Sequence, residues 1–99
     1  MMTNKHIIST ISYTRITRKI KFHQQHYIKT EHDLHLFQDR IQTANKAFVL
    51  DHVLDISYKP FSLKSGLLYL HTNQGVFTYE VMTDPYSFIE EYKKLKCSF

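Results

Sequence analysis

The sequence predicts a mainly β fold of the α+β class, in which about seven short antiparallel strands precede one C-terminal helix. Short runs rich in Ile, Val, Thr, Tyr and Phe alternate with polar breaks along most of the 99 residues. A turn ending in Gly75 joins two such runs, and an amphipathic segment opened by Asp84-Pro85 follows them. Antiparallel meanders of this length generally close into a barrel or pack as two sheets, and a lone helix can cover the open end.

Residues 6–22 contain so much Ile, Thr and Tyr that a strand is favoured over a helix. We predict two strands, over about residues 6–14 and 18–28, joined near residues 15–17. No Gly or Pro marks this joint, so turn chemistry does not fix its position.

Short strands also fill the middle of the chain. A polar, turn-like stretch at residues 30–33 is followed by runs that we predict as strands at residues 34–37, 40–43, 47–50 and 54–58. In the last run Leu54, Ile56 and Tyr58 alternate with polar residues, which is typical of a strand with one buried face. Pro60 should end this strand because it lacks a backbone donor.

A hairpin and a helix form the last part. Residues 67–72 and 76–82 read as paired strands, and Gly75 can take the positive φ that a three-residue hairpin loop requires. Asp84 can cap the helix with its carboxylate, and Pro85 suits the first helical position. The spacing of four apolar residues then predicts a buried stripe, formed by Phe88, Ile89, Tyr92 and Leu95.

Length and composition indicate one globular domain over residues 1–99, with 42% hydrophobic and 14% aromatic residues. No apolar run approaches the roughly 18–20 residues that span a bilayer, and the first residues lack the apolar segment of a secretory signal. Cys97 is the one cysteine, so no internal disulfide is expected. We therefore expect a cytoplasmic protein.

The net charge of +4 is unevenly distributed. Residues 1–30 carry six cationic side chains and no acidic one, so the remaining residues sum to −2. Such asymmetry fits an acidic partner: a lipid headgroup, a nucleic acid or an acidic protein. A solvated strand face that protects a sheet edge from aggregation also explains it, and we favour this explanation.

The order of the segments resembles the pleckstrin-homology-like (PH-like) fold, especially its small bacterial members. The resemblance rests on LHLFQDRIQT, FVLDHVLDISY, the hairpin LLYLHTNQGVFTYEV and the helix DPYSFIEEYKKL. It covers residues 32–96 by pattern and residues 6–30 by strand count. It implies a seven-stranded antiparallel partial barrel of two sheets, capped by one C-terminal helix. Its motifs concern packing and turns, so it implies no chemistry.

In eukaryotic relatives, a basic loop between the first two strands binds phosphoinositide headgroups. Arg15, Arg18, Lys19 and Lys21 lie near the equivalent junction and resemble that pattern loosely, since two isoleucines interrupt the spacing. These four residues are our candidates for binding an anionic ligand. Peripheral binding to an anionic lipid surface is accordingly our alternative function.

Seven histidines raise a metal hypothesis. The candidate ligands are His23, His26, His32 and His35, in two pairs with a three-residue spacing. Residues three apart on a strand point to opposite faces, so each pair converges only where its segment turns. A closed zinc site needs four ligands. We favour surface histidines, and keep metal binding as a second alternative.

No catalytic signature emerges. A thiol at Cys97, close to the last residue, would not hold a fixed attack geometry. Asp51 and Asp55 imply no cleft, and two glycines cannot make a Gly-rich phosphate loop. We expect a protein that is not an enzyme, with no cofactor and no small-molecule substrate.

The leading functional expectation is a non-catalytic protein-binding or self-association module. Self-association would use an exposed strand edge near residues 54–60. Nucleic acid binding would use Tyr13, Phe22 and Tyr27 as stacking surfaces. These aromatics alternate with charges as in any amphipathic strand, so we do not expect a nucleic acid partner.

Overall fold

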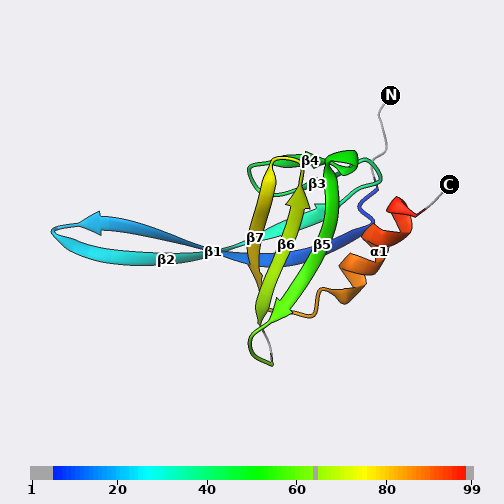
Figure 1. The fold of residues 1–99 in the computed structure, drawn as a ribbon. Coiled ribbons are helices and arrows are strands. Elements are labelled where there is room, and N and C mark those ends of the chain that lie inside the picture. The colour runs from blue at the N-terminus through cyan, green and yellow to red at the C-terminus, as the bar shows by residue number, and fades with distance from the viewer. Residues whose placement is uncertain (1–5, 64, 98–99) are drawn as a thin grey trace.

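A computed structural model describes residues 6–63 and 65–97. This part of the chain forms seven strands, one short 3-10 helix (η1) and one α-helix (Figure 1). The elements are β1 (Ser9–Lys21), β2 (Gln24–Leu36), β3 (Arg40–Gln42), β4 (Ala47–Val49), η1 (Leu50–His52), β5 (Val53–Pro60), β6 (Gly66–Thr72), β7 (Gly75–Val81) and α1 (Tyr86–Lys96). The strands form one antiparallel sheet in the order β4-β3-β2-β1-β7-β6-β5. The predicted mainly β fold with seven antiparallel strands and a C-terminal helix is confirmed.

The first hairpin differs from the prediction. β1 and β2 are each 13 residues long and pair over their whole length, from Ser9 with Leu36 to Lys21 with Gln24. The turn is therefore at Phe22 and His23, and a joint near residues 15–17 is wrong. Residues 30–33 are also part of β2 rather than a turn, because Asp33 pairs with Ser12.

Two residues with positive φ make this turn. Phe22 has φ of 53° and His23 has φ of 63°, as a two-residue type I′ hairpin loop requires. Side chains with a Cβ rarely take this conformation, and Asn-Gly or Asp-Gly usually supplies it. The sequence therefore carries no ordinary turn signal at the point where the chain reverses.

The second hairpin follows the prediction closely. β6 pairs with β7 from Gly66 with Val81 to Thr72 with Gly75. Gly75 has φ of 121°, which confirms the predicted positive φ at the end of the loop. The Thr72 hydroxyl donates to the Gly75 carbonyl at 2.8 Å and also accepts from the Gln74 N–H at 3.0 Å.

Helix α1 begins at Tyr86, so Pro85 is its N-cap residue and not, as predicted, its first helical residue. The Asp84 carboxylate accepts a hydrogen bond from the Tyr86 N–H at 2.9 Å, so it satisfies a backbone donor at the start of the helix. Phe88, Ile89 and Tyr92 are buried, and Leu95 packs partly buried against the core. Full burial of an apolar side chain such as Phe88 contributes about 1.5–3 kcal/mol, so this stripe holds the helix on the sheet.

The core lies between the curved sheet and α1, and residues from all seven strands and the helix line it. At one end of the helix stripe, the Tyr92 hydroxyl donates to the Val53 carbonyl at 2.7 Å. Lys96 Nζ donates to the Leu50 carbonyl at 3.1 Å. These two bonds tie α1 to η1 and the start of β5.

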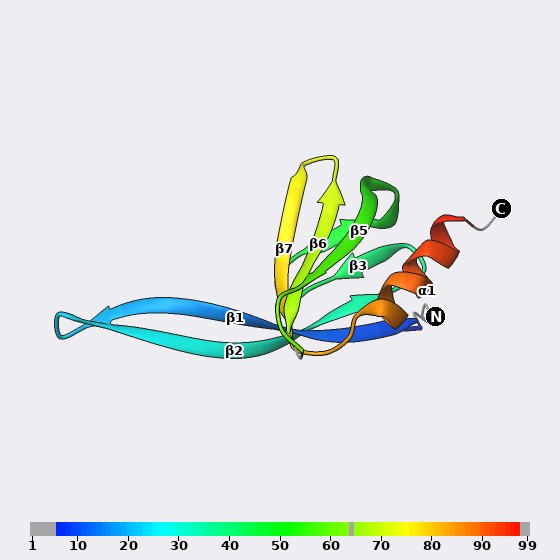
Figure 2. The same ribbon diagram turned by 60° about the horizontal axis from the view of Figure 1, so that its bottom comes forward.

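About half of the first hairpin projects beyond the rest of the molecule, which we call the body (Figures 1 and 2). β1 pairs with β7 only at Tyr13 and Thr14, and β2 pairs with β3 only at His35 and Leu36. Residues 15–30 therefore have no neighbouring strand beyond each other. They form a two-stranded ribbon, here called the arm, on a molecule 55 Å in its longest dimension.

Candidate functional site

The arm is exposed to solvent along its entire length. Every residue from 15 to 30 is exposed, and none belongs to the core. It carries Arg15, Arg18, Lys19, Lys21 and Lys29 without an acidic residue. Four of these are the cations that the sequence predicts as candidates for an anionic ligand, and the structure brings them onto one projecting element.

The register divides the arm into two faces, because directly opposed residues of an antiparallel pair share a face. Arg15, Lys19 and Lys21 lie on one face, here called the basic face, opposite Thr30, His26 and Gln24. Ile16, Arg18 and Ile20 lie on the other, here called the apolar face, opposite Lys29, Tyr27 and Gln25.

Large apolar side chains are concentrated on the apolar face and at the tip. Ile16 is 56% exposed, Ile20 75% and Tyr27 65%, and Phe22 in the turn is 84% exposed. The basic face carries Ile28 alone, at 40%. The arm is thus an amphipathic ribbon with cations on both faces and most of its apolar surface on one.

The arm cations have no carboxylate partner among the described residues. The two ion pairs there, Arg40–Asp39 and Lys94–Glu91, both lie on the body. One arm cation contacts an aromatic ring: Lys21 Nζ lies 5.9 Å from the centre of the Phe22 ring. Their charge is therefore left for solvent or for a partner.

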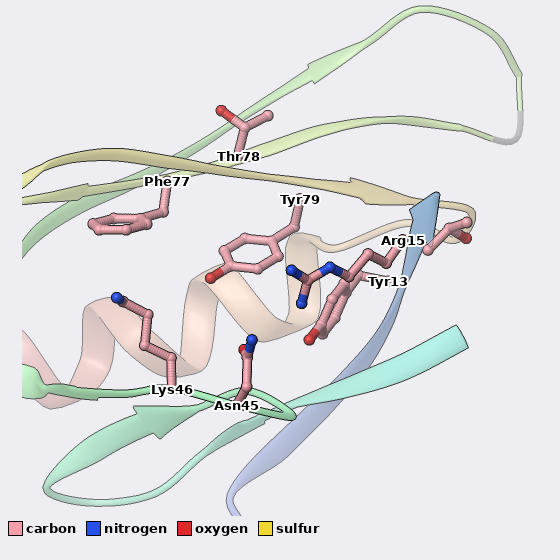
Figure 3. Close-up of a pocket in the computed structure, with 8 residues that line it drawn as sticks. Tyr13, Arg15, Asn45, Lys46, Phe77, Thr78 and Tyr79 are labelled. Carbon is pink, nitrogen blue, oxygen red and sulfur yellow. The ribbon is translucent and has the colours of Figure 1, made fainter. Parts of the chain in front are cut away.

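A pocket of about 370 Å³ opens where the arm joins the body. β1, the β3–β4 connection and β7 build this root pocket, whose lining residues are Tyr13, Thr14, Arg15, Asn45, Lys46, Phe77, Thr78 and Tyr79. Two of them are cations and none is acidic. Figure 3 shows the Tyr79 hydroxyl between the Lys46 ammonium group and the Arg15 guanidinium group.

Aromatic rings form one wall of the root pocket. The Tyr13 and Tyr79 rings meet edge to face with their centres 4.9 Å apart, and the Tyr13 hydroxyl accepts from the Ala44 N–H at 3.3 Å. Lys46 Nζ lies 5.1 Å from the centre of the Phe77 ring. Burial, together with a smaller effect of Tyr13 that Arg15 opposes, raises the pKa of Tyr79 to about 12. Its hydroxyl is therefore protonated, and a donor, at neutral pH.

The candidate histidines do not converge. His23 lies at the tip of the arm and His26 faces Lys19 farther along it. His32 bonds Thr30 at 2.9 Å and lies against the Tyr13 ring, whereas His35 bonds Thr10 at 2.9 Å. Within residues 6–63 and 65–97, no three His, Cys, Asp or Glu side chains are grouped so that they could hold a metal ion.

The strand edge predicted for self-association belongs to β5, which is an outer strand of the sheet. Leu54 on it is exposed. Helix α1 lies alongside β5 in both views (Figures 1 and 2), and the Tyr86 ring meets the Tyr58 ring edge to face at 5.7 Å.

The remaining chemical candidates stay apart from the arm. Cys97 is exposed at the end of α1, and Asp51 and Asp55 lie on η1 and β5. The described residues include no helix with the length and hydropathy of a membrane span. No protein-family model matches the chain, and no curated protein matches it in sequence.

Proposed function

We propose that this protein is a non-catalytic binding module that attaches to an anionic lipid surface through its arm. The observation that carries the proposal is the sorting of side chains on the ribbon: exposed Ile16, Ile20 and Tyr27 share one face, which also carries two of the five arm cations. The other three cations lie on the opposite face of the same narrow ribbon. An element of this kind rests at the boundary of a bilayer, with apolar side chains toward the acyl chains and cations at the phosphates.

The physical properties of an isolated ribbon support a bound partner. A two-stranded ribbon is marginally stable alone in water, and the arm leaves several large apolar side chains in solvent. An anionic bilayer would bury these side chains and neutralise the cations together. Arg18 and Lys29 lie on the apolar face itself, where long side chains can extend sideways to reach the headgroups.

Vesicle binding tests this proposal. Each Lys or Arg near an anionic membrane contributes about 1 kcal/mol. Replacing Arg18 and Lys19 with Gln should therefore weaken partitioning onto phosphatidylserine-containing vesicles about 30-fold. Ile20→Ser should weaken it further, and added salt should weaken wild-type binding. Lys59→Gln/Lys93→Gln removes the same charge from the body and is the matched control.

Two outcomes would contradict membrane attachment. One is equal binding of the arm variant and the body control, which would mean that net charge alone attracts the protein. The other is salt-sensitive binding of the arm to duplex or single-stranded nucleic acid with no binding to vesicles. That result would assign the arm to a different polyanion.

Self-association is the second candidate, because β5 is an outer strand with exposed Leu54 and exposed Lys59. A partner could add a strand along residues 54–60. Sedimentation over a concentration series tests this: a rising mass that Leu54→Lys abolishes would support it, and a constant monomer mass would contradict it. Metal binding through His23, His26, His32 and His35 has no such supporting observation.

The PH-like architecture is also part of the proposal. Seven antiparallel strands in the order β4-β3-β2-β1-β7-β6-β5, with α1 packed over the core, are compatible with a partial barrel of two sheets. The angle between the β1–β4 and β5–β7 halves of the sheet is the feature that tests it.

A further inference from the structure

The root pocket has properties that attachment through the arm does not explain. Three of its polar groups come from outside the arm: Asn45 and Lys46 from the β3–β4 connection, and Tyr79 from β7. Only Arg15 is shared with the arm. The pocket is therefore a second place where positive charge gathers.

The two cations of the pocket lie on either side of the Tyr79 hydroxyl, without a counter-charge in the lining (Figure 3). Arg15 and Lys46 line one cavity, no lining residue is acidic, and neither forms an ion pair with another described residue. Two like charges facing one space repel each other, and an anion between them removes that repulsion and gains attraction from both. Lys46 is held at the wall by the Phe77 ring, so it is already directed along the cavity.

The neutral groups add hydrogen-bond donors. The Tyr79 hydroxyl has no hydrogen-bond partner among the described residues and lies between the two cations in Figure 3. Asn45 Oδ1 accepts from the Thr43 hydroxyl at 3.3 Å, which leaves the amide NH₂ group available to donate. An Arg fork, a Lys ammonium, a phenol and an amide NH₂ can each donate to an incoming oxygen ligand.

We propose that the root pocket is a binding site for a small phosphate-type anion, held by Arg15 and Lys46 with hydrogen bonds from Tyr79 and Asn45. Guanidinium and ammonium groups both bind phosphate oxygens with charge-assisted hydrogen bonds. The volume of about 370 Å³ exceeds that of inorganic phosphate, so the pocket also admits an organic group beside the Phe77 ring. The phosphate can belong to a free phosphomonoester or to a lipid headgroup.

Titration of the full-length protein with inorganic phosphate, followed by amide NMR at constant ionic strength, tests the site. Phosphate should produce saturable shifts at Asn45, Lys46 and Tyr79, and chloride should not. Lys46→Gln and Tyr79→Phe should each weaken phosphate binding about tenfold. The matched control is Lys59→Gln, which removes one cation from β5 and should leave phosphate binding unchanged.

Vesicles separate the two sources of phosphate. Saturable binding of free phosphate supports the site with a soluble ligand. Binding only to phosphatidic acid vesicles, lost in Lys46→Gln, supports the site with a headgroup ligand. Equal phosphate responses in Lys46→Gln and Lys59→Gln, or no response to either source, would overturn it. Lys46 and Tyr79 lie outside the arm. The double variant Arg18→Gln/Lys19→Gln should therefore still bind inorganic phosphate, even if it no longer binds vesicles.

Discussion

At the scale of single residues, Tyr92 joins distant parts of the body. Its ring is 2% exposed within the core, and its hydroxyl donates to the carbonyl of Val53, 39 positions earlier in the chain. Burial, with a smaller contribution from the charge of Asp55, raises the pKa of Tyr92 to about 12. The 3.6-residue period predicts that this side chain is buried, but it contains no information on the partner of the hydroxyl.

Removing this hydroxyl should destabilise the protein. Tyr92→Phe keeps the ring and leaves the buried Val53 carbonyl without its donor, which costs about 1–3 kcal/mol. Urea unfolding measures the loss. Tyr86→Phe is the control, since Tyr86 is exposed and should change the free energy of unfolding by less than about 0.5 kcal/mol.

The pH dependence of unfolding gives an independent check on Tyr92. Its folded pKa is about 12 against an ordinary 10.0, so the folded state favours the protonated phenol. This contribution is complete below pH 10.0 and disappears as pH rises toward 12, because the unfolded chain releases its proton first. Wild-type stability should therefore fall more steeply over this interval than that of Tyr92→Phe. Parallel curves would mean that Tyr92 is not the responsible group.

At the scale of elements, the arm is long because its sequence contains nothing that stops a strand. Residues 6–21 lack Gly and Pro and are rich in β-branched residues, so β1 continues until Phe22 and His23 reverse the chain. The left-handed backbone conformation costs each of these residues roughly 1–2 kcal/mol. The turn is thus a weak point at the tip of a ribbon that few contacts support.

Replacing Phe22-His23 with Asn-Gly should stabilise the arm, because these residues accept the two positive φ angles readily. The backbone amides of residues 15–30 should exchange with solvent several-fold more slowly, while exchange in β6 stays unchanged. Hydrogen exchange followed by NMR measures both. Unchanged or faster exchange in the arm would show that the tip does not limit its opening. The double variant Phe22→Ala/His23→Ala is the control for loss of the two native side chains.

The sequence predicts an element correctly where turn or capping residues mark its ends, and it fails where such residues are absent. Gly75 and Asp84-Pro85 mark the second hairpin and the helix, and both predictions hold. The predicted position of the first hairpin turn is wrong because neither Phe22 nor His23 is a usual turn residue. Its cations were identifiable from charge alone, whereas Lys46 and Tyr79 were not. Those two residues meet Arg15 only through the pairing of β1 with β7 and the path of the β3–β4 connection.

At the scale of the whole molecule, the protein divides into a body that holds the core and an arm that holds none of it. Within the described part of the chain, the fifteen buried hydrophobic residues that form the core all lie outside residues 15–30. The arm therefore contributes to the fold only through its own ladder and its junction with β7. Substitutions in the arm can therefore change what it binds without disturbing the core.

Removing the arm tests this division. Replacing residues 16–29 with Asn-Gly keeps Arg15 opposite Thr30, which is their natural register, and closes β1–β2 with a favourable turn. The shortened protein should still unfold cooperatively, with its midpoint within a few degrees of wild type, as calorimetry would measure. It should no longer bind phosphatidylserine-containing vesicles. Loss of cooperative unfolding would show that the arm is part of the folding unit.

The direction of the first strand has a practical consequence for handling the protein. β1 starts at Ser9 beneath α1, and α1 itself ends at Lys96, both on the side of the body opposite the arm (Figures 1 and 2). An affinity tag, a fluorophore or a sensor-chip linkage fused beyond either of these residues therefore leaves Phe22 pointing outward. A molecule immobilised in this orientation presents the arm to a ligand in solution.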